Sequence, residues 1–138
     1  PGATDPVDRV SCRPDFMILM YPVIDMKGPH THVGSRRNLL GAQSSPALRE
    51  QLSPQLQVTE KTPPAFLVHT STDRVVPVQN SVLFYLALRE AGVPAEMHIF
   101  EEGPHGVGLA RDRPAVTVWT ELCLNWLRGR GLLRPPGK

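Results

Sequence analysis

The chain has 138 residues, of which 41% are hydrophobic, and its formal net charge is +2. This length and composition predict one globular domain with one core, spanning residues 1–138. The basic residues form no stripe interleaved with aromatic side chains, and no apolar run is as long as a transmembrane helix. We therefore expect neither a nucleic-acid partner nor insertion into a membrane; nothing in the sequence indicates a compartment.

The first predicted element is a strand at Asp15–Tyr21, a dense apolar run bounded by prolines. Its hydrophobicity is continuous rather than alternating, which favours a parallel strand buried on both faces. The following segment is polar and rich in Gly, Pro and Ser, with one short helix predicted at 46–52 and capped by Ser45. A connection of this length is rarely structureless, so we interpret 25–60 as a crossover with a lid-like excursion.

The second predicted strand begins at Ala65, is followed by Asp73, and leads into a helix over Pro77–Ala91. Proline is favoured in the first turn of a helix, and Gly92 provides a stop signal at its end. Residues at helical spacing are expected to form its buried face. They are Val78, Val82, Tyr85, Leu86 and Arg89.

A third strand is predicted at Glu96–Phe100, followed by a glycine-rich loop that carries His105. A last helix is expected at 113–128, with Asp112 as its cap. The element order predicts an α/β fold with three layers, in which a parallel sheet of about three strands is flanked by helices. The buried stripe of the last helix is expected to be Val116, Trp119, Leu122, Cys123, Trp126 and Leu127.

Asp73 and His105 are the residues that point to chemistry, because each follows a predicted parallel strand. The carboxyl ends of parallel strands meet at one edge of the sheet, where α/β proteins place their active sites. An aspartate there can fix the tautomer of an imidazole, whose other nitrogen then acts as a general base. The alternative is structural: Asp73 caps a turn and His105 only occupies a glycine-rich loop.

The remaining titratable residues indicate no metal or cofactor site. His30 and His32 could be two metal ligands, but no third ligand follows at a suitable spacing. Cys12 and Cys123 match no metal or redox motif and are expected to be buried, inert thiols. His69 is expected to be a core residue or a support for the site, and His98 a strand residue.

Three blocks of sequence resemble one family. They are RPDFMILMYPVIDM at 13–26, THVGSRRNLLG at 31–41, and the block at 62–109 that contains both Asp73 and His105. Together they are similar to the carboxyl-terminal half of a bacterial α/β-hydrolase esterase. The chain is most similar to the group of acetylxylan and feruloyl esterases, and more distantly to prolyl oligopeptidases.

The resemblance implies roles for individual residues. Asp73 matches the acid and His105 the base of the family's Ser-Asp-His triad, Tyr21 and Pro22 would lie beside the substrate pocket, and residues 25–60 would help to wall it. The implied activity is hydrolysis of carboxylic esters by a serine nucleophile, without a cofactor. Acylated plant polysaccharide is the implied substrate class.

One family motif is missing from the sequence. There is no G-x-S-x-G nucleophile elbow, since Gly34-Ser35 is followed by two arginines and Ser44-Ser45 precedes a predicted helix. The resemblance therefore implies that the serine lies upstream of this chain, which would be nearly inactive alone. The alternative is a non-catalytic α/β module that self-associates or binds a partner chain.

The strand at Asp15–Tyr21 also suggests a partner. In the family this strand pairs on both sides, so without an upstream half it becomes an apolar edge. Such edges tend to pair with another strand. We therefore expect a homodimer through Asp15–Tyr21 across a two-fold axis, or association with a complementing amino-terminal half.

Overall fold

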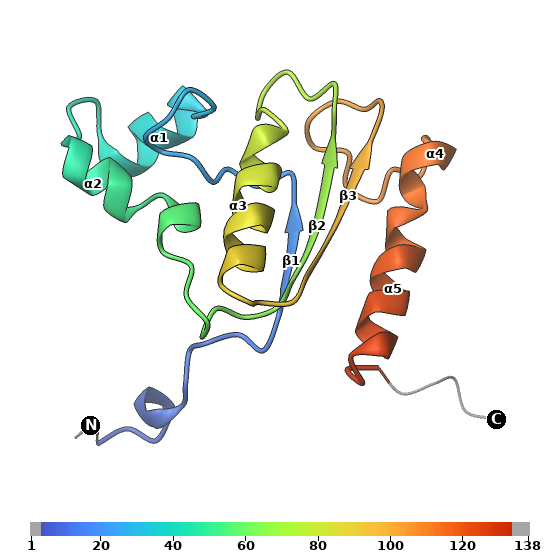
Figure 1. The fold of residues 1–138 in the computed structure, drawn as a ribbon, viewed down its shortest axis with the longest axis horizontal. Helices are drawn as coiled ribbons and strands as arrows, with labels where there is room; N and C mark the ends of the chain where they lie inside the picture. Colours follow the sequence, from blue (N-terminus) through green and yellow to red (C-terminus); the bar gives the residue numbers. More distant parts are fainter. Residues whose placement is uncertain (1–3, 134–138) are drawn as a thin grey trace.

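A computed structural model describes residues 4–133 of the chain, and its three strands form one parallel sheet in the order β1-β2-β3 (Figure 1). The predicted α/β class and the three strands are confirmed. The strands are β1 (Met17–Met20), β2 (Ala65–Thr70) and β3 (Ala95–Phe100). The helices are α1 (Val33–Leu40), α2 (Pro46–Gln51), α3 (Gln79–Glu90), α4 (Pro114–Thr117) and α5 (Trp119–Gly129), with 3-10 turns at η1 (Val7–Arg9) and η2 (Pro54–Leu56).

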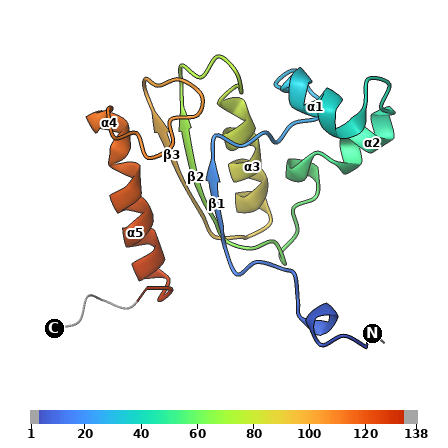
Figure 2. The ribbon, with the colours of Figure 1, turned by 180° about the vertical axis from the view of Figure 1, so that it is seen from behind.

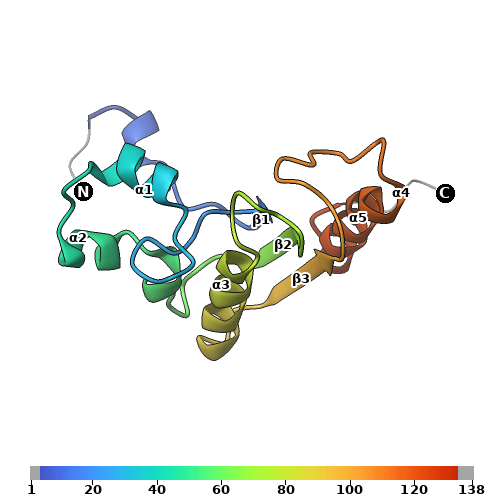
Figure 3. The ribbon, with the colours of Figure 1, turned by 90° about the horizontal axis from the view of Figure 1, so that it is seen from above.

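Helices cover the two faces of the sheet, with α3 on one side and α5 on the other (Figure 3). Successive side chains of a strand point to opposite faces, so β2 contributes to two apolar clusters. Leu67 packs with Phe84 and Leu88 of α3. On the other face, Phe66 and Val68 pack against α5, and the rings of Phe66 and Trp126 lie 5.7 Å apart. The expected layers are present.

Strand β1 is less buried than the sequence predicted. It pairs only with β2 among the described strands, through the register Met17–Ala65 to Met20–Val68. Ile18 is 38% exposed, whereas every residue of β2 is buried. Burial on both faces was therefore the wrong expectation for β1, because a continuous apolar run does not reveal how many neighbours its strand has. Among the strands of residues 4–133, β1 lies at one edge of the sheet.

The crossover between β1 and β2 contains more structure than predicted. Figures 1 and 2 show α1 and α2 beside α3, on the side of the molecule away from α5. Ser45 caps α2 as expected, since its hydroxyl accepts a bond from the amide of Leu48. Helix α1 was missed because it buries no residue and is capped by the ring of His32, an uncommon cap.

Helix α3 buries a different face from the predicted one. Leu86 is 57% exposed and Arg89 is also exposed. The predicted face included Arg89 and omitted the apolar Phe84 and Leu88, and half of the observed buried face is polar and hydrogen-bonded inside the protein. The buried residues of α3 are Asn80, Ser81, Phe84 and Leu88.

The last helix is divided at Val118 into α4 and α5. Arg113 rather than Asp112 is the N-cap residue of α4, and no side chain bonds to that end of the helix. The predicted apolar stripe is correct, and its Cys123 is buried as expected. Cys12 is exposed, contrary to expectation, because the segment before β1 packs against little else. No helix between residues 4 and 133 has the length and apolarity to cross a bilayer.

Candidate active site

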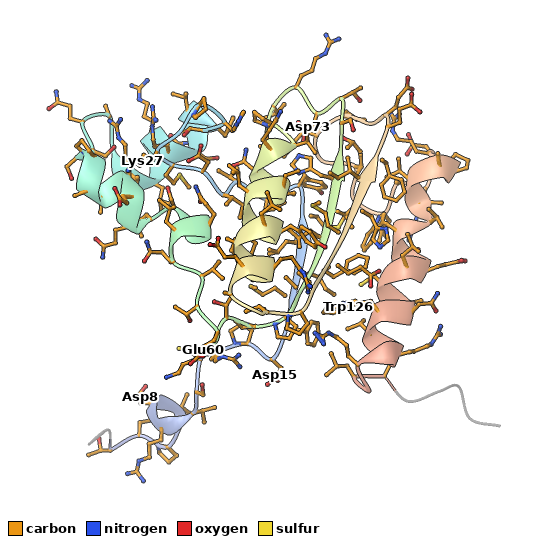
Figure 4. All side chains as sticks on the ribbon, viewed as in Figure 1. Asp8, Asp15, Lys27, Glu60, Asp73 and Trp126 are labelled. Atoms are coloured by element: carbon orange, nitrogen blue, oxygen red, sulfur yellow. The ribbon has the colours of Figure 1, made fainter. Side chains whose placement is uncertain are left out.

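The two sequence-predicted site residues meet at the edge of the sheet toward which the strands point. Asp73 follows β2 by three residues, and Figure 4 places it at this end, with Trp126 and Asp15 at the opposite end. Nδ1 of His105, in the loop after β3, lies 2.8 Å from Oδ2 of Asp73. The expected proximity of the two side chains is confirmed.

The partner of His105 determines that Nδ1 is the ring nitrogen that carries a proton. A carboxylate oxygen can only accept, so Nδ1 carries the proton and donates it to Asp73. Nε2 is then the nitrogen with the free lone pair, and about a third of the His105 side chain is exposed. This is the arrangement that a general base requires, with one ring nitrogen oriented by a carboxylate and the other available to a reactant.

The carboxylate of Asp73 is buried and fully occupied by donors. Oδ1 accepts bonds from the amides of Val75 and Val76 at 2.8 and 2.9 Å, while Oδ2 faces His105. Burial opposes the charged form, but the bonds from His105 and from the two amides outweigh it, and the pKa of Asp73 lies below its ordinary value. Asp73 therefore both closes the turn and remains ionised beside His105.

The loop that carries His105 is fastened to the end of β2 through Gly103. The carbonyl of Gly103 accepts bonds from the hydroxyls of Thr70 and Thr72, and its amide donates to Thr72. A Cβ at this position would lie 2.7 Å from Cγ2 of Thr70, so only glycine allows this approach. His105 is thereby held two residues from a fixed point.

Tyr21 contacts His105 directly. Its ring centroid lies 4.8 Å from that of His105 in an edge-on arrangement, and its hydroxyl accepts a bond of 3.4 Å from the amide of Gly108. The backbone of Tyr21 has φ of +39°, a left-handed conformation that costs about 1–3 kcal/mol for a bulky residue. Strain of this kind is typical of functional sites, and here it directs the ring to His105.

An open cleft of about 480 Å³ adjoins His105. Its lining includes three charged side chains, those of Arg74, Glu102 and Arg113, together with the backbone around Gly103. Tyr21 and Pro22 are not among the residues that line it, so their predicted place beside a substrate pocket stays a prediction.

A nucleophile is not found next to the base within the described part of the chain. Between residues 4 and 133, no serine hydroxyl lies within hydrogen-bonding distance of Nε2 of His105. The hydroxyl of Ser35 contacts Nδ1 of His32 at 2.8 Å, and that of Ser81 contacts His69. The same residues contain no group of three His, Cys, Asp or Glu side chains that could hold a metal ion.

His69 was expected to be a core residue or a support for the site, and the structure places it in the core beside Asp73. It is fully buried, and its Nε2 lies 3.3 Å from Oδ2 of Asp73. Its position four residues before Asp73 on a buried strand was visible, but the turn that brings the two side chains together was not.

The sequence model of the prolyl oligopeptidase family matches residues 15–129, a range that contains β1, the crossover and both site residues. The chain belongs to the prolyl oligopeptidase family. Members of this family have the α/β-hydrolase fold, in agreement with the parallel sheet and the Asp73–His105 pair.

Curated relatives of the family are much longer than this chain. An endo-1,4-beta-xylanase B from Butyrivibrio fibrisolvens is 46% identical over 103 residues, which are 75% of this chain and 16% of that protein. An acetylxylan esterase from Xylanibacter ruminicola is 41% identical over 100 residues, which are 70% of this chain and 21% of that protein.

Solved structures are also similar to most of this chain and are longer than it. An acetyl ester-xyloside bifunctional hydrolase from Caldicellulosiruptor lactoaceticus has a TM-score of 0.92 and 50% identity, over 96% of this chain and 48% of that one. The carboxylesterase Cest-2923 from Lactobacillus plantarum has a TM-score of 0.75 and 31% identity, over 94% of this chain and 50% of that one. The chain therefore spans about half the length of these hydrolase structures.

Proposed function

We propose that the chain is the acid and base half of a serine carboxylic ester hydrolase. In this proposal Asp73 is the acid, His105 is the general base, and the serine comes from a segment outside residues 4–133. The bond of 2.8 Å from Nδ1 of His105 to a buried, ionised Asp73 is the observation that supports it most directly. The names of the relatives, which include a carboxylesterase and an acetylxylan esterase, support the reaction class.

The proposed reaction is acyl transfer in two steps. Nε2 of His105 takes the proton of the serine hydroxyl as its oxygen attacks the ester carbonyl, and then gives that proton to the departing alcohol. The acyl-enzyme is hydrolysed by a water that His105 deprotonates in the same way. Asp73 stays ionised throughout and stabilises the imidazolium in each step.

Acylated plant polysaccharide, with xylan acetyl esters as the first case, is the substrate class we propose. The support comes from relatives whose names include acetylxylan esterase and acetyl ester-xyloside hydrolase. The cleft beside His105 is open, and its lining includes Arg74, Glu102 and Arg113, whose side chains can hydrogen-bond to the hydroxyls of a sugar chain.

A chimera tests the proposal. Residues 13–133 of this chain would replace the corresponding half of the Caldicellulosiruptor hydrolase, whose backbone they match. We expect the chimera to hydrolyse 4-nitrophenyl acetate and acetylated xylan, while the chain alone stays near the uncatalysed rate. His105→Ala should lower kcat of the chimera by about 10⁴-fold or more, as loss of a triad member does in other serine hydrolases.

His98→Ala is the matched control, because His98 lies on β3, is partly exposed and bonds only to Glu96 among the described residues. It should leave kcat within about threefold of the parent chimera. A folded chimera without esterase activity, or one whose activity survives His105→Ala, would refute the proposed function.

A second candidate function is supported by the open edge of β1. A non-catalytic module would use this strand, with Ile18 exposed, to associate with a second copy or a partner chain. Inactivity of the folded chimera, together with a stable dimer of the chain alone, would favour this candidate.

A further inference from the structure

A buried histidine connects the acid of the candidate site to helix α3. Nδ1 of His69 lies 2.7 Å from the hydroxyl of Ser81, and Nε2 lies 3.0 Å from the carbonyl oxygen of Val76. The same Nε2 is 3.3 Å from Oδ2 of Asp73, the oxygen that also accepts from His105. A continuous network thus runs from Ser81 through His69 and Asp73 to the base.

The partners of His69 select one protonation state. The carbonyl oxygen of Val76 can only accept, so Nε2 carries a proton, and the free lone pair of Nδ1 accepts the hydroxyl proton of Ser81. Burial lowers the pKa of His69 below its ordinary value and outweighs the opposite effects of the Val76 carbonyl and of Asp73. The ring is therefore neutral at neutral pH and holds a single tautomer.

His69 fixes the carboxylate of Asp73 from two sides. The carbonyl of Val76 accepts from His69, while the amide of the same residue donates to Oδ1 of Asp73 at 2.9 Å. The turn that holds Oδ1 is thus tied to the imidazole ring. The direct approach to Oδ2 is longer, at 3.3 Å against 2.8 Å for His105, so His69 competes only weakly for that oxygen.

We propose that His69 is a positioning residue, which orients Asp73 toward His105 by holding the turn 73–76 and which is itself oriented by Ser81. The proposal deepens the proposed function, since it assigns a support to the acid of that site. If the imidazole ring of His69 is removed, we expect the turn 73–76 to relax and the hydrogen bond between Asp73 and His105 to weaken.

The titration of His105 reports that bond without any need for catalysis. The Hε1 resonance of His105 would be followed from pH 4 to 9 in the 138-residue chain and in three variants, His69→Phe, His69→Gln and Ser81→Ala. A weaker bond stabilises the imidazolium less, so the midpoint should be lower in His69→Phe than in the native chain. Glutamine can place an N–H near the position of Nε2, so His69→Gln should restore part of the shift. Ser81→Ala should give a smaller fall, because it keeps the ring but releases its orientation.

The other charged groups near His105 are the same in every variant. They are Arg74, Glu102 and Arg113 in the cleft, and the uncharged ring of Tyr21 that packs against His105 is also unchanged. A difference in the His105 midpoint between variants can therefore be assigned to the substitution itself. His98→Gln controls for loss of a histidine elsewhere in the sheet and should leave the His105 midpoint unchanged. Circular dichroism would identify any variant that fails to fold; if His69→Phe does so, Ser81→Ala and His69→Gln decide.

A midpoint that is unchanged or raised in the folded variants would overturn the proposal. A fall that is larger in His69→Phe than in His69→Gln would support it. The result is separate from the esterase test, because an inactive chimera would refute the reaction while the titration would still report whether His69 orients Asp73.

Discussion

The side chain of Asn80, in helix α3, accepts a hydrogen bond of 2.8 Å from the amide of Ile24, which lies 56 residues earlier in the chain. The same oxygen accepts from the amide of Asp25, and the amide nitrogen donates to the carbonyls of His30 and Pro77. One buried side chain thus satisfies four backbone groups and fastens the start of the crossover to α3. Figure 1 shows this crossover leaving the sheet beside α3.

Replacing Asn80 by alanine should destabilise the chain by about 3 kcal/mol. The substitution leaves buried amides of Ile24 and Asp25 and the carbonyl of His30 without their partner, and each unsatisfied group costs about 1–3 kcal/mol. Urea unfolding followed by circular dichroism measures the change. Gln79→Ala, at the exposed neighbouring position, should cost less than about 0.5 kcal/mol; equal effects at the two positions would contradict this account.

Asp73→Asn should lower stability at pH 7 by about 2 kcal/mol, because charged hydrogen bonds from His105 and two amides are replaced by neutral ones. The pKa of Asp73 is lowered in the folded chain, so its contribution is present above the ordinary value of 3.8 and is lost as pH falls through the folded value. The difference in unfolding free energy between the native chain and Asp73→Asn should therefore become smaller below pH 3.8. Asp112→Asn, at a 79% exposed side chain, should show no such gap.

Stability should fall between pH 7 and pH 5 in a way that depends on His69. Its folded pKa lies below the ordinary 6.5, because burial disfavours the charged ring. Between the folded pKa and 6.5, the unfolded chain binds a proton at His69 that the folded chain does not bind. The free energy of unfolding therefore decreases as pH falls through this range, by up to about 1.4 kcal/mol per pH unit. Above pH 6.5 this contribution is fully present.

Comparison with His69→Gln isolates that dependence, since all other histidines are shared. Urea unfolding at pH 7, 6 and 5 should show a steeper loss for the native chain than for the variant. Parallel pH dependences would mean that the pKa of His69 is the same in the folded and the unfolded chain, which would contradict a pKa lowered by burial.

The chain alone should form a dimer through β1. This strand is at the edge of the described sheet, its residue Ile18 is 38% exposed, and no charged side chain interrupts Met17–Met20. Light scattering at low micromolar concentration should give twice the monomer mass. Ile18→Lys should yield a monomer or an aggregate. Gln79→Lys adds the same charge at an exposed position of α3 and should leave the dimer intact. A native chain that is monomeric with cooperative unfolding would contradict this expectation.

The sequence predicted elements wherever one physical signal was sufficient. Continuous apolar runs located the first two strands, and strand ends located Asp73 and His105, because a parallel sheet brings its carboxyl ends together. The face of α3 could not be predicted in this way, since Asn80 and Ser81 are buried by hydrogen bonds to residues distant in the sequence. Helix α1 could not be predicted for the opposite reason. It buries no residue, so its sequence shows no apolar periodicity.

The candidate site was predicted as the pair Asp73 and His105, whereas the structure connects this pair to further side chains by hydrogen bonds and close contacts. The Asp73–His105 pairing follows from topology, whereas the contacts of His69 and the left-handed backbone of Tyr21 depend on turn geometry that residue types do not determine. Cys12 shows the same limit, because a thiol carries no sign of whether its segment packs.

The unequal attachment of the two outer strands has a consequence for the order of folding. Strand β2 reaches β3 through residues 71–94 and pairs with it from Ala65–Ala95 to Thr70–Phe100, whereas β1 is separated from β2 by residues 21–64 and pairs over a shorter register. Closing the longer connection costs about 0.5 kcal/mol more chain entropy. We therefore expect the unit β2-α3-β3 to form first and β1 to pair with it afterwards. In the folded chain, the amide hydrogens of β1 exchange with solvent before those of β2.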